Sequence, residues 1–162
     1  MKKTFSALPL LAAVFALPLH AATLTEKNIS LQQANDLAAA VINACAAKNY
    51  NVSVTVLDRG GNIKALQRMD NAGPHTIKAS EMKAFTALST KNASGKVMEG
   101  SQASAGATNL RDIPGFLLLA GGLPLRDGDQ VIGAVGVGGA PGGNLDEQCA
   151  QAATDSVLKA DK

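Results

Sequence analysis

His75 has the clearest capacity for metal chemistry in this 162-residue sequence, which contains one other histidine, His20. A neutral imidazole is the most common metal ligand among protein side chains. His75 follows Gly73 and Pro74 in an expected loop just before a helix, where its side chain could reach a cleft or a subunit interface. The alternative is a loop or helix-capping histidine without a ligand.

Basic side chains form a second group of candidates, because guanidinium and ammonium groups bind the carboxylates of ligands through strong charge-assisted hydrogen bonds. They are Arg59, Arg68, Lys78, Lys83 and Arg111. Each could instead be a solvated surface charge or the partner of a neighbouring aspartate. Met69 and Met82 could act as soft metal ligands, although their positions on an expected strand and an expected helix fit core packing as well.

A glycine-rich loop over residues 138–143 leads into the last expected helix. Free N–H groups at a helix start can bind an anion, which makes Gly138 and Gly139 candidate binding residues. The loop lacks the dinucleotide-binding fingerprint, because counting from Gly136 places Pro141 at the last glycine position. The alternative is a connector that lets the helix pack closely on the sheet or on another subunit.

The sequence shows no recognisable catalytic constellation. No histidine belongs to a nucleophile motif with serine or cysteine, and the few Cys and His residues lack the spacing of a zinc site. Non-enzymatic binding is therefore favoured over catalysis. The formal net charge of +2 includes Lys2 and Lys3, without which 13 basic residues face 13 acidic ones. Such a chain lacks the basic face that a nucleic-acid-binding protein needs.

Residues 1–22 have the pattern of a secretory signal peptide. A positively charged start precedes an apolar stretch over residues 5–19, which is too short for a membrane span, and Ala21 offers a small residue for cleavage. We therefore expect an exported protein, periplasmic or secreted, with a single domain over residues 23–162 and no membrane segment after cleavage.

Two cysteines, Cys45 and Cys149, remain in the expected mature chain. An even number of cysteines in an oxidising compartment favours a disulfide. The alternative is a pair of buried thiols that act as small apolar side chains. The two residues lie on the apolar stripes of the first and last expected helices, so a bridge requires those helices to pack side by side.

Hydrophobic periodicity predicts an alternation of helices and hairpins. The first helix should begin after a capping box formed by Ser30 and Gln33. The helix over residues 76–89 should bury Ile77, Met82, Phe85 and Leu88. The expected helices cover residues 31–48, 76–89, 96–104 and 144 onwards, and the expected strands cover residues 52–57, 63–69, 116–120, 123–126 and 131–137. Because hairpins dominate, an α+β fold with helices packed on an antiparallel sheet is predicted.

Three segments carry a resemblance to a known family: the first hairpin over residues 56–62, the helix segment over residues 83–87, and the run over residues 121–125 that continues to residues 131–137. Together they resemble the GlcG/HbpS family of haem-degrading domains, which also forms the C-terminal part of PduO-type proteins. The resemblance covers about residues 24–160. It implies a profilin-like fold, with a five-stranded antiparallel sheet flanked by helices.

The resemblance also implies a ligand and partners. It implies haem or, through the PduO link, a corrinoid. For haem, the chemistry of the residues makes His75 the best candidate axial ligand, and Arg68, Lys78 and Arg111 are candidates to hold the propionates. The first expected helix contains no histidine that could match a ligand of the family. It implies homo-oligomers, with octamers known in the family, and a sensor protein as a partner in haem or iron handling or in redox sensing. Two alternatives stay open: an enzyme or accessory factor for a small organic acid such as glycolate, and an oligomeric scaffold without a small-molecule ligand.

Overall fold

The described part of the computed structural model runs from residue 23 to residue 160. The expected signal peptide, residues 1–22, lies outside these residues. In chain order the elements are α1 (Leu31–Ala46), β1 (Ser53–Asp58), β2 (Ile63–Arg68), α2 (Thr76–Thr90), α3 (Ser94–Ala103), the 3₁₀ helix η1 (Ala105–Asp112), β3 (Gly122–Asp127), β4 (Gln130–Gly138) and α4 (Gly143–Ala160). Within the described residues, no helix combines the length and the apolar character needed to cross a membrane.

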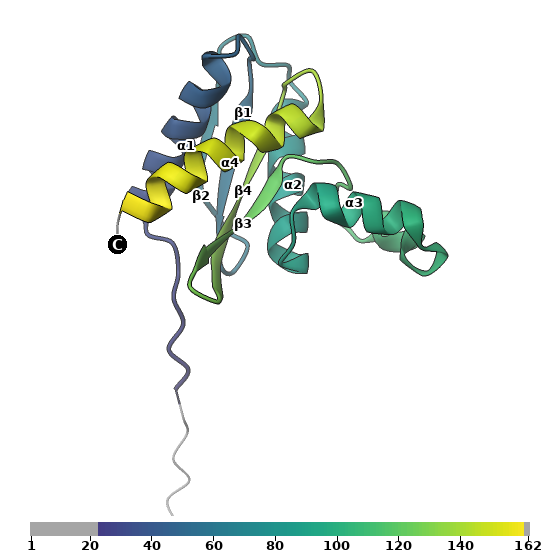
Figure 1. The fold of residues 1–162 in the computed structure, drawn as a ribbon. Coiled ribbons are helices and arrows are strands. Elements are labelled where there is room, and N and C mark those ends of the chain that lie inside the picture. The colour runs from purple at the N-terminus through teal and green to yellow at the C-terminus, as the bar shows by residue number, and fades with distance from the viewer. Residues whose placement is uncertain (1–22, 161–162) are drawn as a thin grey trace, which may run out of the picture.

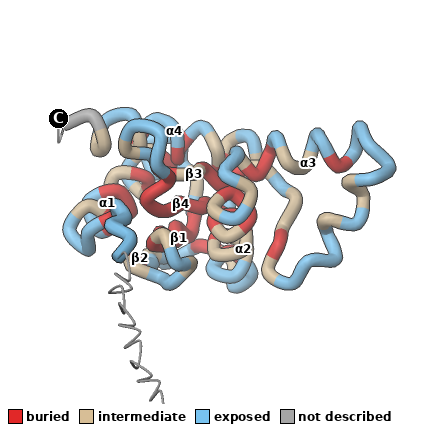
Figure 2. The backbone as a smooth tube through the Cα atoms, turned by 90° about the horizontal axis from the view of Figure 1, so that it is seen from below, coloured by how far each residue is buried: buried red, intermediate tan, exposed pale blue. Residues whose placement is uncertain are grey.

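The strands form one antiparallel sheet in the order β2-β1-β4-β3, which places the two hairpins side by side. At its centre β1 pairs with β4, so that Ser53 lies opposite Gly138 and Asp58 lies opposite Gly133. Figure 1 shows α1 and α4 on one face of the sheet and α2 on the other. In Figure 2 the buried residues gather between these layers.

The predicted fold class, with helices packed on an antiparallel sheet, is confirmed, but the described residues contain four strands where five were expected. The expected strand over residues 116–120 is an irregular segment. Side chains of two helices bind its main chain: the Leu117 N–H donates to Thr86 Oγ1 at 2.9 Å, and the Leu119 carbonyl accepts from Ser94 Oγ at 2.7 Å. An apolar run looks the same in sequence whether strands or side chains satisfy its backbone, which explains the error.

The main core lies between the sheet and the pair α1 and α4, and it contains the large aliphatic side chains. Val54 and Val137, from the central strands, are fully buried against Leu37 and other residues of α1. The capping box of Ser30 and Gln33 at the start of α1 is present as predicted. Because α1 and α4 pack side by side, this face of the sheet is closed by two helices.

Helix α2 meets the opposite face through small residues. Its buried side carries Ser80, Ala84 and Ala87, whereas the large apolar residues expected there are only half-buried or, for Ile77, 36 % exposed. A Cβ atom on Gly136 of β4 would collide with the Ser80 carbonyl, so the helix backbone touches the strand backbone. Phe85 and Leu88 still pack, half-buried, against a small core cluster that includes Leu57 of β1, so the predicted burial is confirmed in part. It was wrong for Ile77, because the close approach of α2 to glycine in β4 puts small residues at the centre of the contact.

Hydroxyl groups add to this close contact. Ser53 and Thr76 share a hydrogen bond of 2.7 Å, and Thr55 and Ser80 share one of 2.8 Å, all four side chains being buried. These bonds fix the position of α2 along β1. Beyond α2, the segment formed by α3 and η1 extends away from the body of the molecule (Figures 1 and 2).

Candidate functional site

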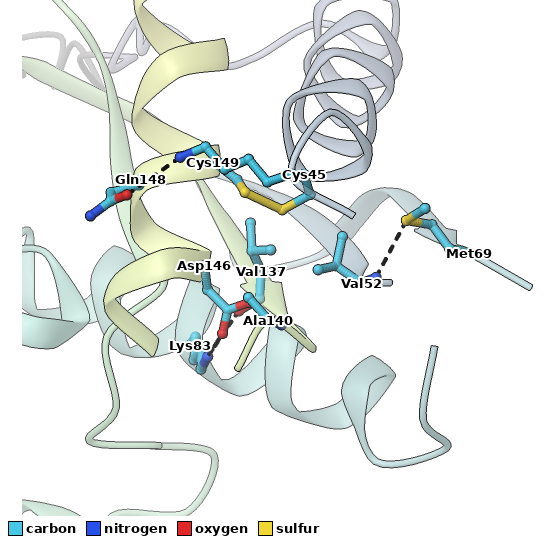
Figure 3. Close-up of a disulfide and its surroundings, with 10 residues drawn as sticks. Cys45, Val52, Met69, Lys83, Val137, Ala140, Asp146, Gln148 and Cys149 are labelled. Atoms are coloured by element: carbon cyan, nitrogen blue, oxygen red, sulfur yellow. Dashed lines mark hydrogen bonds and ion pairs between the residues drawn. A yellow bond between two sulfur atoms is a disulfide. The ribbon is translucent and has the colours of Figure 1, made fainter. Parts of the chain in front are cut away.

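The most deeply buried charges in the described residues are Lys83 of α2 and Asp146 of α4, whose side chains are 2 % and 3 % exposed. Lys83 Nζ lies 2.7 Å from Asp146 Oδ2 and donates to the Val137 carbonyl at 3.0 Å. The N–H of Ala140 donates to Asp146 Oδ1 at 2.9 Å. Figure 3 shows the pair where α2, β4 and α4 meet, a short distance along α4 from the disulfide.

Burial raises the pKa of Asp146 above its ordinary value, because it penalises the charged carboxylate. The hydrogen bond and charge of Lys83 and the Ala140 N–H oppose this effect. Lys83, one of the basic residues considered for binding a ligand's carboxylate, is therefore engaged inside the protein. The pair ties three elements together and leaves no opening for a ligand.

The glycine-rich loop after β4, residues 138–143, already binds a carboxylate of the protein itself. The carboxylate that accepts the Ala140 N–H belongs to Asp146, so this loop already holds an internal anion. A Cβ atom on Gly138 would lie 3.2 Å from the Thr76 carbonyl, and one on Gly139, where φ is +130°, would collide with the Asn51 carbonyl. The geometry favours the packing alternative for both glycines, although Gly138 does lie beside the start of α2.

His75 stands at that start of α2, and its side chain is free of any capping hydrogen bond. The residue is exposed, and its ring lies over Gly73, where an added Cβ atom would be 2.9 Å from His75 Cε1. Lys78 follows three residues later, near the same face of the helix, and pairs with Glu81 at 3.1 Å. Three residues before His75, the Ala72 carbonyl accepts a hydrogen bond from the Arg68 guanidinium. His75, Lys78 and Arg68 thus lie around the loop that leads into α2 and the first turn of that helix, a region that we call the His75 corner.

Arg111 does not join this corner. It lies in η1, where its Nε donates to the Thr108 carbonyl at 2.9 Å, and it lines a separate hollow with Phe116 and Leu118. Met69, considered above as a soft metal ligand, already has a partner inside the protein. Its sulfur accepts a hydrogen bond from the Val52 N–H at 3.4 Å (Figure 3). Arg111 thus belongs to the segment formed by α3 and η1 rather than to α2, and its role as a ligand-binding residue stays a prediction.

The donor set at the His75 corner fits haem better than a bare metal ion. The described residues contain no cluster of three or more His, Cys, Asp or Glu side chains that could hold a metal ion. A haem iron is already held by its macrocycle and takes one or two axial ligands from the protein, so a single exposed imidazole is enough. Basic side chains beside it would then face the propionates.

The Cys45 and Cys149 side chains form a disulfide between α1 and α4, with the two Cα atoms 5.4 Å apart (Figure 3). Both residues are fully buried in the main core. The bridge links segments 104 positions apart in sequence. It therefore closes the first helix onto the last.

A family model described as "Haem degrading protein HbpS-like" matches residues 29–155. The chain belongs to this HbpS-like family. The match spans every helix and strand described above except the last residues of α4. Family membership thus agrees with the resemblance seen in the three sequence segments.

Several known proteins are similar to this HbpS-like chain. "Protein GlcG" of Escherichia coli strain K12 is 35 % identical over 113 residues, which cover 70 % of this chain and 83 % of that protein. The crystal structure of a double mutant of HbpS from Streptomyces reticuli has a TM-score of 0.77 and 37 % identity, covering 91 % of this chain and 97 % of the other. A crystal structure entitled PduOC:Heme Complex has a TM-score of 0.72 at 22 % identity, covering 79 % and 94 %, a likeness that shows the shared fold.

Proposed function

We propose that this chain is an exported haem-binding protein of the GlcG/HbpS type, with His75 as the axial ligand of the iron. The observation that carries the proposal is the exposed His75, the one histidine of the described residues, at the start of α2 in a chain whose family is described as haem-degrading. Arg68 and Lys78 would bind the propionates. Export rests on the signal-peptide pattern of residues 1–22.

The residues of the His75 corner have separable tasks. The His75 ring is exposed and lacks a capping bond, so it can turn toward a ligand without breaking a contact that holds α2. The side chain of Lys78 is 67 % exposed and can exchange Glu81 for a propionate at little cost, because an exposed ion pair is worth at most about 1 kcal/mol. When bound, haem would supply an iron centre able to change oxidation state or take a further ligand, which suits haem or iron handling and redox sensing.

A single chain covers only one side of a ligand bound at an exposed corner. Homo-oligomers, which the family resemblance implies, could cover the other side with a second subunit. The proposal therefore includes assembly of the chain with copies of itself, and light scattering of the protein with and without haemin measures that assembly.

Haemin titration followed by absorbance tests the proposal on the chain from residue 23 onward. The wild type should give a saturable Soret band, and His75→Ala should lose it. Met82→Leu is the matched control, because Met82 is a half-buried alternative soft ligand on the same helix. No band in the wild type would refute haem binding, and a band unchanged in His75→Ala would refute the ligand assignment.

Two further measurements test the other parts of the proposal. A parallel titration with cobalamin measures corrinoid binding, and cleavage at residues 21–22 in a periplasmic fraction measures export.

A further inference from the structure

A second hollow, of about 430 Å³, lies at the other end of α2. Its walls come from the β1–β2 turn at Arg59–Gly61, the end of α2 from Phe85 to Lys91, and the start of β4 at Asp129–Val131. Sixteen helical positions separate His75 from Lys91, which corresponds to about 24 Å along the helix axis. The hollow is therefore distinct from the His75 corner.

The floor of this hollow is apolar, and one aromatic ring dominates it. Phe85 packs edge-on against Phe116, with ring centroids 6.1 Å apart and an interplanar angle of 75°. Another edge of the ring faces Gly61, where an added Cβ atom would lie 3.6 Å from Phe85 Cε2. Because Gly61 has no side chain, that edge stays uncovered. Leu88 and Val131 complete the apolar lining.

The rim of the hollow is mainly basic. Arg59 is held in place, since Nη1 donates to the Val131 carbonyl at 3.0 Å and Nη2 pairs with Glu26 at 2.8 Å. A guanidinium has five N–H donors, so Arg59 keeps donors for a ligand. Lys91 is exposed just beyond the end of α2, while Asp129 adds one negative charge to the rim.

We propose that this hollow binds a small aromatic monocarboxylate, with its ring on Phe85 and Leu88 and its carboxylate toward Arg59 and Lys91. The apolar floor favours a planar hydrophobic body over a phosphate or a sugar acid. The volume falls in the range of small-molecule sites. Asp129 disfavours a ligand with a second negative charge, which separates this ligand class from haem with its two propionates.

Binding of 2-naphthoate, followed by its own fluorescence, tests the proposal, because the protein has no tryptophan and a single tyrosine. We expect saturable binding of one molecule per chain, and at least tenfold weaker binding of the neutral analogue 2-naphthalenemethanol.

Ser89→Glu places a negative charge on the helical wall of the hollow and should weaken naphthoate binding about tenfold more than the matched neutral variant Ser89→Gln. Lys91→Asn, which suits the left-handed backbone at that position (φ 57°), should weaken binding about threefold, whereas Lys48→Asn at the end of α1 should not change it.

Three outcomes of the naphthoate measurements would overturn the proposal, and the haemin competition below adds a fourth. They are the absence of saturable binding at millimolar naphthoate, equal affinities of Ser89→Glu and Ser89→Gln, and equally tight binding of the neutral analogue. Haemin provides a separate check on site identity. If haemin displaces naphthoate and Ser89→Glu weakens haemin binding, the hollow is the tetrapyrrole site and the small-carboxylate assignment is wrong. If haemin binding depends on His75 alone, the two sites are independent.

Discussion

Removal of one member of the buried Lys83–Asp146 pair should destabilise the fold more than any other change to a single charge described above. Lys83→Met leaves Asp146 with only the Ala140 N–H as a partner, and breaking a buried pair in this way typically costs about 3–5 kcal/mol in the free energy of unfolding. Asp146→Ala leaves Lys83 with only the Val137 carbonyl and also removes the acceptor of the Ala140 N–H, which adds about 1 kcal/mol. Asp146→Ala should therefore be the more damaging change.

The double variant separates pairing from packing. Lys83→Met combined with Asp146→Ala should cost less than the sum of the single changes, because no unpaired charge stays buried. Urea unfolding at about pH 7, followed by circular dichroism, gives all four free energies. Lys27→Met is the matched control, because the Lys27–Asp127 pair has a similar 2.8 Å distance but its side chains are 55 % and 42 % exposed, so the change should cost less than about 1 kcal/mol.

The pH dependence gives an independent test of the same reasoning. Burial raises the pKa of Asp146 on folding, so the folded state holds this proton more tightly than the unfolded state. The contribution of this group to stability is thus fully present below the unfolded pKa of about 3.9 and is lost as the pH rises through the folded pKa. Lys83→Met removes the opposing cation, so this variant should recover stability relative to the wild type as the pH falls from about 7 toward 4. A loss at pH 7 below about 1 kcal/mol, or a relative stability that falls with acidification, would refute the argument.

Three further changes test other parts of the fold by the same unfolding assay. Replacing Cys45 and Cys149 with alanine should cost about 2–5 kcal/mol, because the bridge closes a long loop in the unfolded chain, and a variant as stable as the wild type would contradict that role. Gly136→Ala should cost more than about 2 kcal/mol, because its methyl group meets the Ser80 carbonyl, whereas Gly100→Ala on an open helix face should be neutral or stabilising by up to about 1 kcal/mol. Ser30→Ala should cost about 1 kcal/mol through loss of the α1 capping box, and an unchanged midpoint would show that the cap is dispensable.

The sequence by itself determined much of the fold, because the relevant signals are local. Alternation of apolar residues and turn glycines specified both hairpins, and the capping box at Ser30 specified the start of α1. Family membership was also readable from three short segments, and the family model over residues 29–155 agrees with it. Each of these signals depends on residues that are neighbours along the chain.

Tertiary structure alone decided which residues come together. The contact of Gly136 with the backbone of α2 places small residues, rather than the expected large ones, at the centre of the buried side of that helix. Helix side chains replaced a strand as partners of residues 116–120. The pairing of Lys83 with Asp146 joins two segments 63 positions apart, which periodicity cannot detect. Likewise, the hollow around Phe85 is built from three separate segments, and only the assembled sheet and helix bring its apolar floor and its basic rim together. Local patterns define elements, but the choice of contacts between them follows from packing and from the need to satisfy every buried polar group.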